Sequence, residues 1–273
     1  MTAIDRMFGL TGRTALVTGG AGLLGAEFCR TLAEAGAAVC VGDLDEGAAE
    51  RVANALRGAG HRALAHQLDV TNSESSAGAA QEILREHGRI DILVNSAALD
   101  PKFDPSHHEQ ASNAFEDYPL EQWNQALAVN LTGMFLACQA VAPVMRQQGT
   151  GSIINICSTY GLVAPDQRIY QREGQPPQFK PVYYSVTKAG VLGLTRYLAS
   201  YFAGTRIRVN ALTPGGVFNE HDPAFVAQYS ARTILGRMAN RDELNGALLF
   251  LASEASSYMT GSNLIVDGGW TAW

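Results

Sequence analysis

The chain has 273 residues, of which 47% are apolar and 17% charged, with a formal net charge of −6. This balance is typical of a globular protein, and the negative charge argues against nucleic acid as a partner, because phosphate backbones attract basic surfaces. The N-terminus lacks the pattern of a secretory signal, and no run approaches the ~20 apolar residues of a membrane span. We therefore expect a cytoplasmic protein without a membrane partner.

The four cysteines are far apart in the sequence, each within an apolar run. They are Cys29, Cys40, Cys138 and Cys157. Thiols in such surroundings are typical of small buried hydrophobic side chains rather than of a disulfide framework or a zinc site. We expect a reducing compartment and no metal site.

Short apolar runs alternate with helix-length segments along the chain. Strands are predicted in six runs, at residues 13–20, 37–43, 63–70, 90–98, 151–158 and 206–216. Buried strands separated by helices predict an α/β fold with one doubly wound parallel sheet and helices on both faces. No repeat or low-complexity linker interrupts this pattern, so we expect a single domain over residues 1–273.

Three segments interrupt the alternation and are predicted to be insertions around the substrate. Residues 99–118 and 165–181 are polar and contain prolines, and residues 216–235 form the third such segment. The first two follow predicted strands, and ligands of open parallel sheets bind outside the carboxyl ends of strands. We expect these segments to line the substrate site, with His107 and His108 as further candidate contacts; the alternative is solvated surface loops.

The first predicted strand ends in the glycine-rich run TGGAGLLG. Gly20, Gly22 and Gly25 fit the spacing G-x-G-x-x-G, whereas Gly19, Gly22 and Gly25 fit G-x-x-G-x-x-G, and both registers remain open. In either register, positions without side chains let a pyrophosphate approach the amides of a helix N-terminus. Gly19, Gly22, Leu24 and Gly25 are our candidate cofactor contacts here.

Asp43 ends the second predicted strand, twenty-four residues after Gly19. A carboxylate at this place can accept hydrogen bonds from an adenosine ribose and would repel a 2′-phosphate. No lysine or arginine lies in the glycine turn or directly after Asp43, so we expect NAD as the cofactor and NADP as the less favoured one. The alternative is that Asp43 caps the next helix, a role that Asp45 could equally fill.

One tyrosine is paired with a lysine at helical spacing. Of the nine tyrosines, only Tyr184 has a lysine four residues later, at Lys188. Residues i and i+4 share a helix face, whereas Tyr183 and Lys188 point in largely different directions. Tyr184 is therefore the candidate for chemistry, and Tyr183 is predicted to be a packing residue.

These motifs occur in a characteristic order: TGGAGLLG, Asp43, LVNSAA, AVNLTG, IINICSTYG and the pair in YSVTK. In this order the chain resembles the short-chain dehydrogenase/reductase family over nearly its whole length. The resemblance implies a Rossmann-type domain that uses NAD(H) or NADP(H) to oxidise alcohols or reduce carbonyls. It also implies four catalytic residues, Asn130, Ser158, Tyr184 and Lys188.

The resemblance implies a role for each catalytic residue. Tyr184 would be the general base in alcohol oxidation and the acid in the reverse reaction. Lys188 would lower the pKa of the Tyr184 phenol and hold the nicotinamide ribose. Ser158 would bind the reacting oxygen, and Asn130 would position a water-linked proton path. The alternatives are a turn residue at Ser158 and a satisfied buried amide at Asn130.

Further cofactor contacts are implied by family positions. They are Asp69, Val70, Asn95, Ala97, Pro214, Gly215 and Val217. The chain departs from the compact family pattern at three places, where Leu23 and Ala98 replace glycines and Asn219 replaces a threonine. These departures affect fine cofactor geometry but not the reaction class.

The substrate is predicted from the insertion at residues 165–181, which places Ser158 and Tyr184 twenty-six positions apart. The insertion brings charged and aromatic side chains to the mouth of the site: Arg168, Tyr170, Arg172 and Lys180. Together with Ser158, Tyr184 and Asn219, Arg168 and Tyr170 are our candidate substrate contacts.

Four short stretches look like those of a bacterial subgroup of surface-carbohydrate and flagellin-modification enzymes. They are PDQRIY, YSVTKAG, LTRYLASYF and VDGGWTAW. We therefore expect a secondary alcohol of a sugar, sugar acid or polyol as the substrate. The alternatives are a reductase of 3-oxoacyl or other small ketones, an epimerase or dehydratase that retains NAD, and a non-catalytic nucleotide-binding module. In the family that the chain resembles, C-terminal tails commonly pack at subunit interfaces. The resemblance therefore implies that the apolar C-terminus with Trp270 and Trp273 forms contacts in a homotetramer, or second a dimer; the alternative is docking within its own chain.

Overall fold

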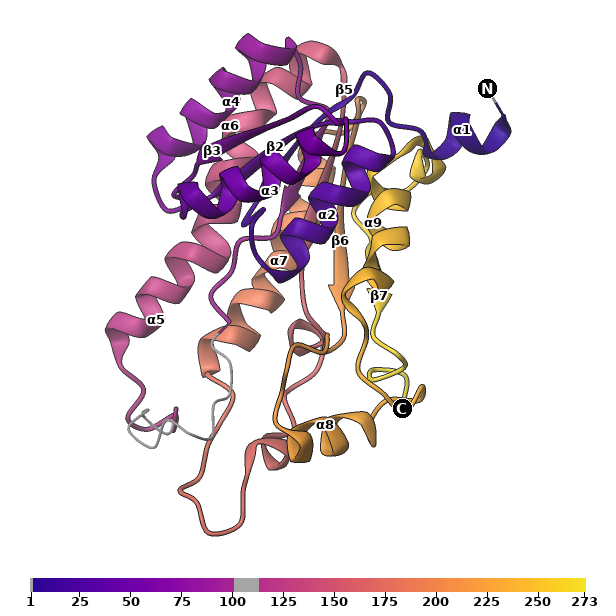
Figure 1. Ribbon diagram of the computed structural model, residues 1–273. Coiled ribbons are helices and arrows are strands. Elements are labelled where there is room, and N and C mark those ends of the chain that lie inside the picture. The colour runs from indigo at the N-terminus through magenta and orange to yellow at the C-terminus, as the bar shows by residue number, and fades with distance from the viewer. Residues whose placement is uncertain (1, 101–112) are drawn as a thin grey trace.

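Seven parallel strands form a single sheet in the computed structural model, which describes residues 2–100 and 113–273 (Figure 1). The order is β3-β2-β1-β4-β5-β6-β7. The strands are β1 (Thr14–Thr18), β2 (Ala38–Asp43), β3 (Ala63–Gln67), β4 (Ile92–Asn95), β5 (Thr150–Ile156), β6 (Arg206–Pro214) and β7 (Asn263–Val266). The chain winds outward from β1 in one direction and from β4 in the other, which confirms the doubly wound, Rossmann-type sheet.

Helices cover both faces of the sheet. They are α1 (Ala3–Phe8), α2 (Leu23–Glu34), α3 (Glu46–Gly58), α4 (Ser73–His87), α5 (Leu120–Leu127), α6 (Gly133–Gln148), α7 (Val182–Tyr201), α8 (Pro223–Ser230) and α9 (Asn245–Ala252). One hydrophobic core joins the sheet to α2, α3 and α9, and a second joins it to α4, α6 and α7. Ala15 and Val17 of β1 point into the first core and Leu16 into the second, because successive side chains of a strand face opposite ways.

The six strands predicted from the sequence are confirmed, and β7 is the one that the prediction missed. This strand has only four residues, lies at the edge of the sheet and is partly exposed. It therefore lacks the nearly continuous burial of the central strands β1, β2, β4 and β5. The four cysteines are buried and unpaired, as expected.

One helical stretch, residues 120–148, is long and apolar enough to span a membrane by length and composition. It runs through α5, a short π-helix (Ala128–Thr132) and α6. The core helix of a globular protein meets the same criteria, and α6 packs against α4 and β5 in the second hydrophobic core. One face of α6 is therefore buried within the fold.

Candidate active site

A cavity of about 580 Å³ lies at the carboxyl ends of the central strands β1 and β4. After β1 the chain continues toward one edge of the sheet, and after β4 it continues toward the other. Parallel sheets bind ligands at this crossover point. One end of the cavity is lined by the glycine turn and Asp43, and the other by Ser158, Tyr184 and Tyr229. The glycine turn, Asp43 and three of the predicted catalytic residues, Ser158, Tyr184 and Lys188, therefore share one cavity.

The glycine turn between β1 and α2 is shaped by close backbone contacts. A Cβ at Gly19, whose φ is +62°, would lie 2.7 Å from the Cα of Ala97, and one at Gly25 would lie 2.0 Å from the Gly19 carbonyl oxygen. Gly19, Gly22 and Gly25 line the cavity, whereas a Cβ at Gly20 would meet β2, 2.9 Å from the Cγ1 of Val41. The G-x-x-G-x-x-G spacing is thus the one that faces the cavity.

The same turn fits the pyrophosphate of a dinucleotide. Gly22 begins α2 without a side-chain cap, and Leu24 and Gly25 of the first helical turn also line the cavity. The first amides of a helix have no partner within the helix, and its positive dipole end favours an anion. The backbone itself therefore supplies a site for phosphate groups.

Asp43 lies in the cavity and does not cap α3. Its carboxylate accepts hydrogen bonds from the amides of Ala21, at 3.0 Å, and Asp45, at 3.2 Å. The cap of α3 is Asp45, whose side chain accepts from the amide of Ala48 at 2.9 Å. The capping alternative is therefore wrong for Asp43, and its carboxylate braces the glycine turn from the end of β2.

The other predicted cofactor positions lie along the same cavity, with one exception. Asp69, Val70, Ala97, Pro214, Gly215 and Val217 line it. Asn95 does not, because its side-chain amide donates to Asn155 at 2.9 Å and is buried between β4 and β5. Its placement against the cofactor is corrected by the structure: Asn95 holds two central strands together.

Tyr184, Lys188 and Ser158 meet at the far end of the cavity. Tyr184 and Lys188 lie on one face of α7 and are both buried, with the Lys188 Nζ 5.8 Å from the centroid of the Tyr184 ring. Lys188 donates to the carbonyl oxygen of Ile156 at 2.9 Å, and Ser158 forms a hydrogen bond with Tyr184. The helical spacing thus brings the two side chains together as predicted, and Tyr183 instead packs against Tyr118.

The electrostatics of Tyr184 differ from the expectation. Burial raises the pKa of Tyr184 well above its ordinary value, the nearby Asp100 carboxylate raises it further, and the hydrogen bond with Ser158 lowers it. Burial also lowers the pKa of Lys188. The lowering predicted from Lys188 is therefore not the net direction in this structure, where the loss of hydration of the phenolate on burial is the largest influence on the pKa of Tyr184.

Asn130 lies in the π-helix between α5 and α6, an irregularity that often occurs at functional sites. Its side chain accepts from the Leu99 amide at 2.6 Å, donates to the Leu99 carbonyl at 3.1 Å and contacts the Thr187 hydroxyl at 3.4 Å. All of its polar side-chain atoms therefore bind protein groups. The side chain fixes Leu99 beside α7, as expected for the alternative of a satisfied buried amide, and its role in a water-linked proton path stays a prediction.

Aromatic side chains from two of the predicted insertions line the substrate end. Tyr170 comes from residues 165–181, and Phe225 and Tyr229 come from α8, within residues 216–235. The sequence interpretation missed Phe225 and Tyr229, although their spacing of four places them on one face of α8. That spacing has functional meaning only once α8 is known to lie at the cavity.

Of two further predicted substrate contacts, one lines the cavity and the other does not. Asn219 lines the cavity and accepts a hydrogen bond from Arg241 at 3.2 Å. Arg168 is 83% exposed, pairs with Asp166 and does not line the cavity, so its predicted substrate role is corrected. In the first insertion, His107 and His108 lie outside the described residues.

The C-terminus was predicted to dock on another subunit, and the structure corrects this prediction for Trp270. Trp270 is buried in its own chain, stacked on Tyr229 with ring centroids 4.2 Å apart. Trp273 is 78% exposed, and its indole donates to the carbonyl of Arg232 at 3.1 Å. Trp270 therefore supports the wall of the cavity from behind.

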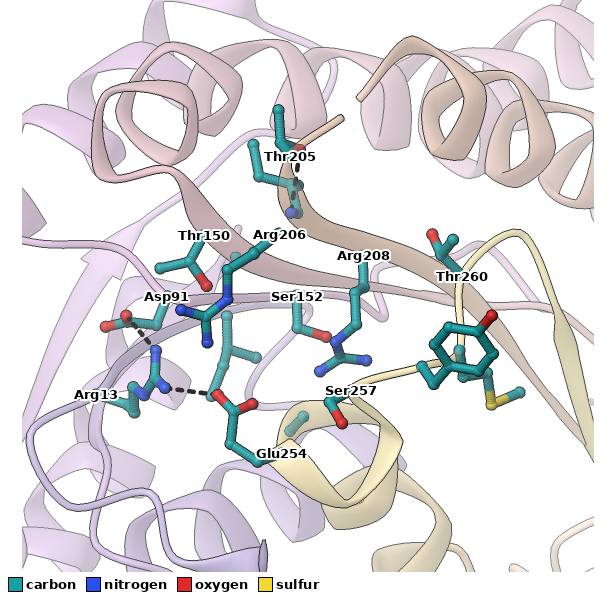
Figure 2. A pocket seen from close by; sticks show the side chains of 16 residues that line it. Arg13, Asp91, Thr150, Ser152, Thr205, Arg206, Arg208, Glu254, Ser257 and Thr260 are labelled. Atoms are coloured by element: carbon teal, nitrogen blue, oxygen red, sulfur yellow. Dashed lines mark hydrogen bonds and ion pairs between the residues drawn. The ribbon is translucent and has the colours of Figure 1, made fainter. Parts of the chain in front are cut away.

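A second cavity, of about 390 Å³, lies at the amino ends of β4, β5 and β6 (Figure 2). Arg13 is bound there to Asp91 and Glu254, and Arg208 donates to the carbonyls of Leu251 and Ser253. These bonds join strand beginnings to the end of α9, which is a structural role. In the described part of the chain, no cluster of three His, Cys, Asp or Glu side chains could hold a metal ion.

Comparisons with known proteins agree with this fold and site. A family model described as enoyl-(acyl carrier protein) reductase matches residues 20–271. The chain is 39% identical to a cis-4-hydroxycyclohexanecarboxylate dehydrogenase of Sinomonas cyclohexanicum, over 95% of this chain and 97% of that protein. It is 37% identical to a D-threitol dehydrogenase of Mycolicibacterium smegmatis, over 98% and 96% of the two chains.

A solved structure gives the same result. A gluconate 5-dehydrogenase from Burkholderia cenocepacia J2315, in complex with NADP and tartrate, superimposes with a TM-score of 0.86 at 35% identity over the whole of both chains. The protein belongs to the short-chain dehydrogenase/reductase family. It is an NAD(P)-dependent oxidoreductase that interconverts an alcohol and a carbonyl compound.

Proposed function

We propose that this protein oxidises a secondary alcohol of a sugar, sugar acid or polyol to the ketone, with NAD as the hydride acceptor. The observation that carries the proposal is the meeting of Tyr184, Ser158 and Lys188 at one end of a cavity whose other end is the glycine turn. The named relatives support the substrate class, because they act on a hydroxylated ring acid and on a polyol. The narrower resemblance to surface-carbohydrate and flagellin-modification enzymes stays a prediction.

The proposed mechanism assigns a task to each side chain. The Ser158 hydroxyl and the phenolic oxygen of Tyr184 hold the reacting oxygen, and the phenolate form of Tyr184 accepts its proton during oxidation. When bound, the nicotinamide ring accepts or supplies the hydride, and its oxidised form adds positive charge beside the phenol. Lys188, fixed by the Ile156 carbonyl, holds the nicotinamide ribose, and Asn130 positions the Leu99 backbone next to the site.

Asp43 is the reason for proposing NAD rather than NADP. Its carboxylate faces the cavity, where it would bind the ribose hydroxyls and repel a 2′-phosphate. Among the described residues that line the cavity, the cations are Lys180 and Lys188, both at the substrate end. The related gluconate 5-dehydrogenase contains NADP, so the preference of this chain needs its own measurement.

We also propose a single cytoplasmic domain that assembles as a homotetramer, with a dimer as the second choice. Phe135 of α6 and Tyr197 and Tyr201 of α7 are exposed apolar side chains on neighbouring helices, and Trp273 is exposed at the C-terminus. Exposed aromatic surface of this kind is typical of contacts between subunits. Size-exclusion chromatography with light scattering measures the state directly.

The test is a screen of polyols, sugars and sugar acids with NAD and NADP, followed by NADH absorbance at 340 nm. Tyr184→Phe is expected to lower kcat about 1,000-fold while leaving NADH affinity within about twofold, because only the proton-accepting oxygen is removed. Tyr183→Phe, at the buried neighbour, is the matched control and should stay within a few-fold of the wild type. Substantial turnover by Tyr184→Phe, or none by the wild type with any of these alcohols, would contradict the proposal.

A further inference from the structure

Lys180 places a second ammonium group beside the reacting tyrosine. It ends the insertion at residues 165–181, and its Nζ lies 4.1 Å from the centroid of the Tyr184 ring. Its side chain is only 12% exposed and lines the cavity. The chain has three lysines, and the two that lie in the described residues, Lys180 and Lys188, both contact this ring.

The counter-ion of Lys180 is the carboxylate of Asp100, which also lines the cavity. Asp100 follows Leu99, the residue whose backbone is fixed by Asn130. Its negative charge also raises the pKa of Tyr184, so the carboxylate lies near both the Lys180 ammonium and the phenol. A substrate that reaches Tyr184 must enter this space.

The two side chains of this ion pair differ in their exposure to solvent. The Asp100 side chain is 47% exposed, so its carboxylate can be hydrated by water when another anion takes its place beside Lys180. The Lys180 ammonium is nearly buried, and a buried charge requires an opposite charge or hydrogen-bond acceptors. An incoming anion can therefore replace Asp100, whereas Lys180 stays in place.

The other cations near the site are committed to other partners. Arg172 is held by Asp222 at 2.5 Å, Arg168 by Asp166, and Lys188 by the Ile156 carbonyl. Arg241 donates to the side chain of Asn219 at 3.2 Å. Arg168, Arg172 and Arg241 are absent from the described lining of the cavity. Lys180 is thus the cation at the substrate end whose partner can be exchanged.

We propose that Lys180 binds the carboxylate of a hydroxy-acid substrate by displacing Asp100, which makes this enzyme selective for acids over neutral alcohols. The inference rests on the proposed function and narrows its substrate class. Lys180 would anchor one end of the substrate while Ser158 and Tyr184 hold the hydroxyl group that reacts. The aromatic wall formed by Tyr170, Phe225 and Tyr229 would contact the carbon skeleton between them.

The test compares two substrates that differ only in charge, cis-4-hydroxycyclohexanecarboxylate and its carboxamide, with NAD. We expect the wild type to prefer the acid by about 10- to 100-fold in kcat/KM, the range for a charge-assisted hydrogen bond. Lys180→Met should remove most of this preference, mainly by raising KM for the acid, and Lys180→Arg should restore part of it. Arg168→Gln, which removes a charge of the same insertion outside the cavity, is the matched control and should preserve the preference.

Asp100→Asn is a second test of the proposal, and its result does not depend on whether a Lys180 variant folds. Removing the competing carboxylate should lower KM for the acid several-fold and change KM for the carboxamide less. In the wild type, cyclohexanecarboxylate, which has no hydroxyl group to oxidise, should inhibit at least tenfold more strongly than cyclohexanecarboxamide.

The outcomes separate this inference from the proposed function. Three results would overturn the role of Lys180. They are an equal loss of kcat/KM with acid and carboxamide in Lys180→Met, a higher KM for the acid in Asp100→Asn, and equal inhibition by cyclohexanecarboxylate and cyclohexanecarboxamide. Wild-type oxidation of neutral polyols without any preference for acids would overturn the inference alone. Absence of alcohol oxidation with every compound would overturn the proposed function as well.

Discussion

The two ends of the active-site cavity are built from different parts of the chain and by different means. The nucleotide end depends on backbone: Gly19 and Gly25 allow close contacts, and Asp43 braces their turn, all within one β-α-β unit. The substrate end depends on large side chains such as Tyr170 and Tyr229, which come from segments far apart in the sequence. A site made by the local path of the backbone is visible in a short motif, whereas a site made by distant side chains is not.

The two ends are joined at the loop after β6. The amide of Gly216 donates to the hydroxyl of Tyr229 at 2.5 Å, and the neighbouring Gly215 lies against the backbone of Asp267, 2.8 Å from where its Cβ would be. Tyr229 in turn stacks on Trp270. The C-terminal segment therefore supports both the aromatic wall and the predicted nicotinamide contacts.

The largest effect is expected at the nucleotide end, from Gly25→Ala. The new methyl group would lie 2.0 Å from the Gly19 carbonyl oxygen, and a backbone atom in a tight turn cannot move aside cheaply. We expect NADH binding to weaken at least 100-fold and the free energy of unfolding to fall by about 3 kcal/mol. Fluorescence titration and urea unfolding measure the two quantities.

Gly78→Ala is the matched control for this substitution. Gly78 lies within α4, and a Cβ there meets no atom within 4 Å. The change should stabilise the protein by up to about 1 kcal/mol and leave cofactor binding unaltered, because alanine favours a helix over glycine. Normal NADH binding by Gly25→Ala would contradict the description of the nucleotide end as a backbone-determined site.

The next effect is expected at the substrate end, from Trp270→Ala. Removing a buried ring stacked on Tyr229 should cost about 3 kcal/mol of unfolding free energy and raise the substrate KM by a larger factor than the Kd of NADH. Trp273→Ala, at the exposed neighbour, should cost less than about 1 kcal/mol in the folded subunit. A loss of NADH affinity in Trp270→Ala equal to its loss of substrate affinity would show that the two ends are not separable.

The same contrast explains what the sequence could predict. Six strands, the glycine turn and the pairing of Tyr184 with Lys188 follow from local spacing, and each is found in the structure. The direction of the Tyr184 pKa could not be predicted, because it depends on burial among aromatic rings and on Asp100, eighty-four positions earlier in the chain. Lys180 was visible as a charge of the insertion, but its place over the Tyr184 ring requires the packed fold.

A smaller effect, on specificity rather than on stability, is expected from Asp43→Asn. The amide keeps the shape of the side chain but removes the charge that would repel a 2′-phosphate. We expect the ratio of kcat/KM with NADP to that with NAD to rise about tenfold or more, measured with one saturating alcohol. An unchanged ratio, or a wild type that already prefers NADP, would contradict the assignment of Asp43.

The smallest effect is expected from Asp45→Ala, two residues further along the chain. Asp45 caps α3 through the Ala48 amide and is not among the described residues that line the cavity. Its loss should cost about 1 kcal/mol of unfolding free energy, as for other helix caps, and leave the NADP to NAD ratio unchanged. A changed ratio of kcat/KM with NADP to that with NAD in Asp45→Ala would contradict this assignment. It would mean that the total negative charge of this loop selects the cofactor, rather than the one carboxylate that lies in the cavity. Because Asp43 and Asp45 have the same chemistry and differ only in the direction that the backbone gives them, this pair tests most directly whether backbone path determines the nucleotide end.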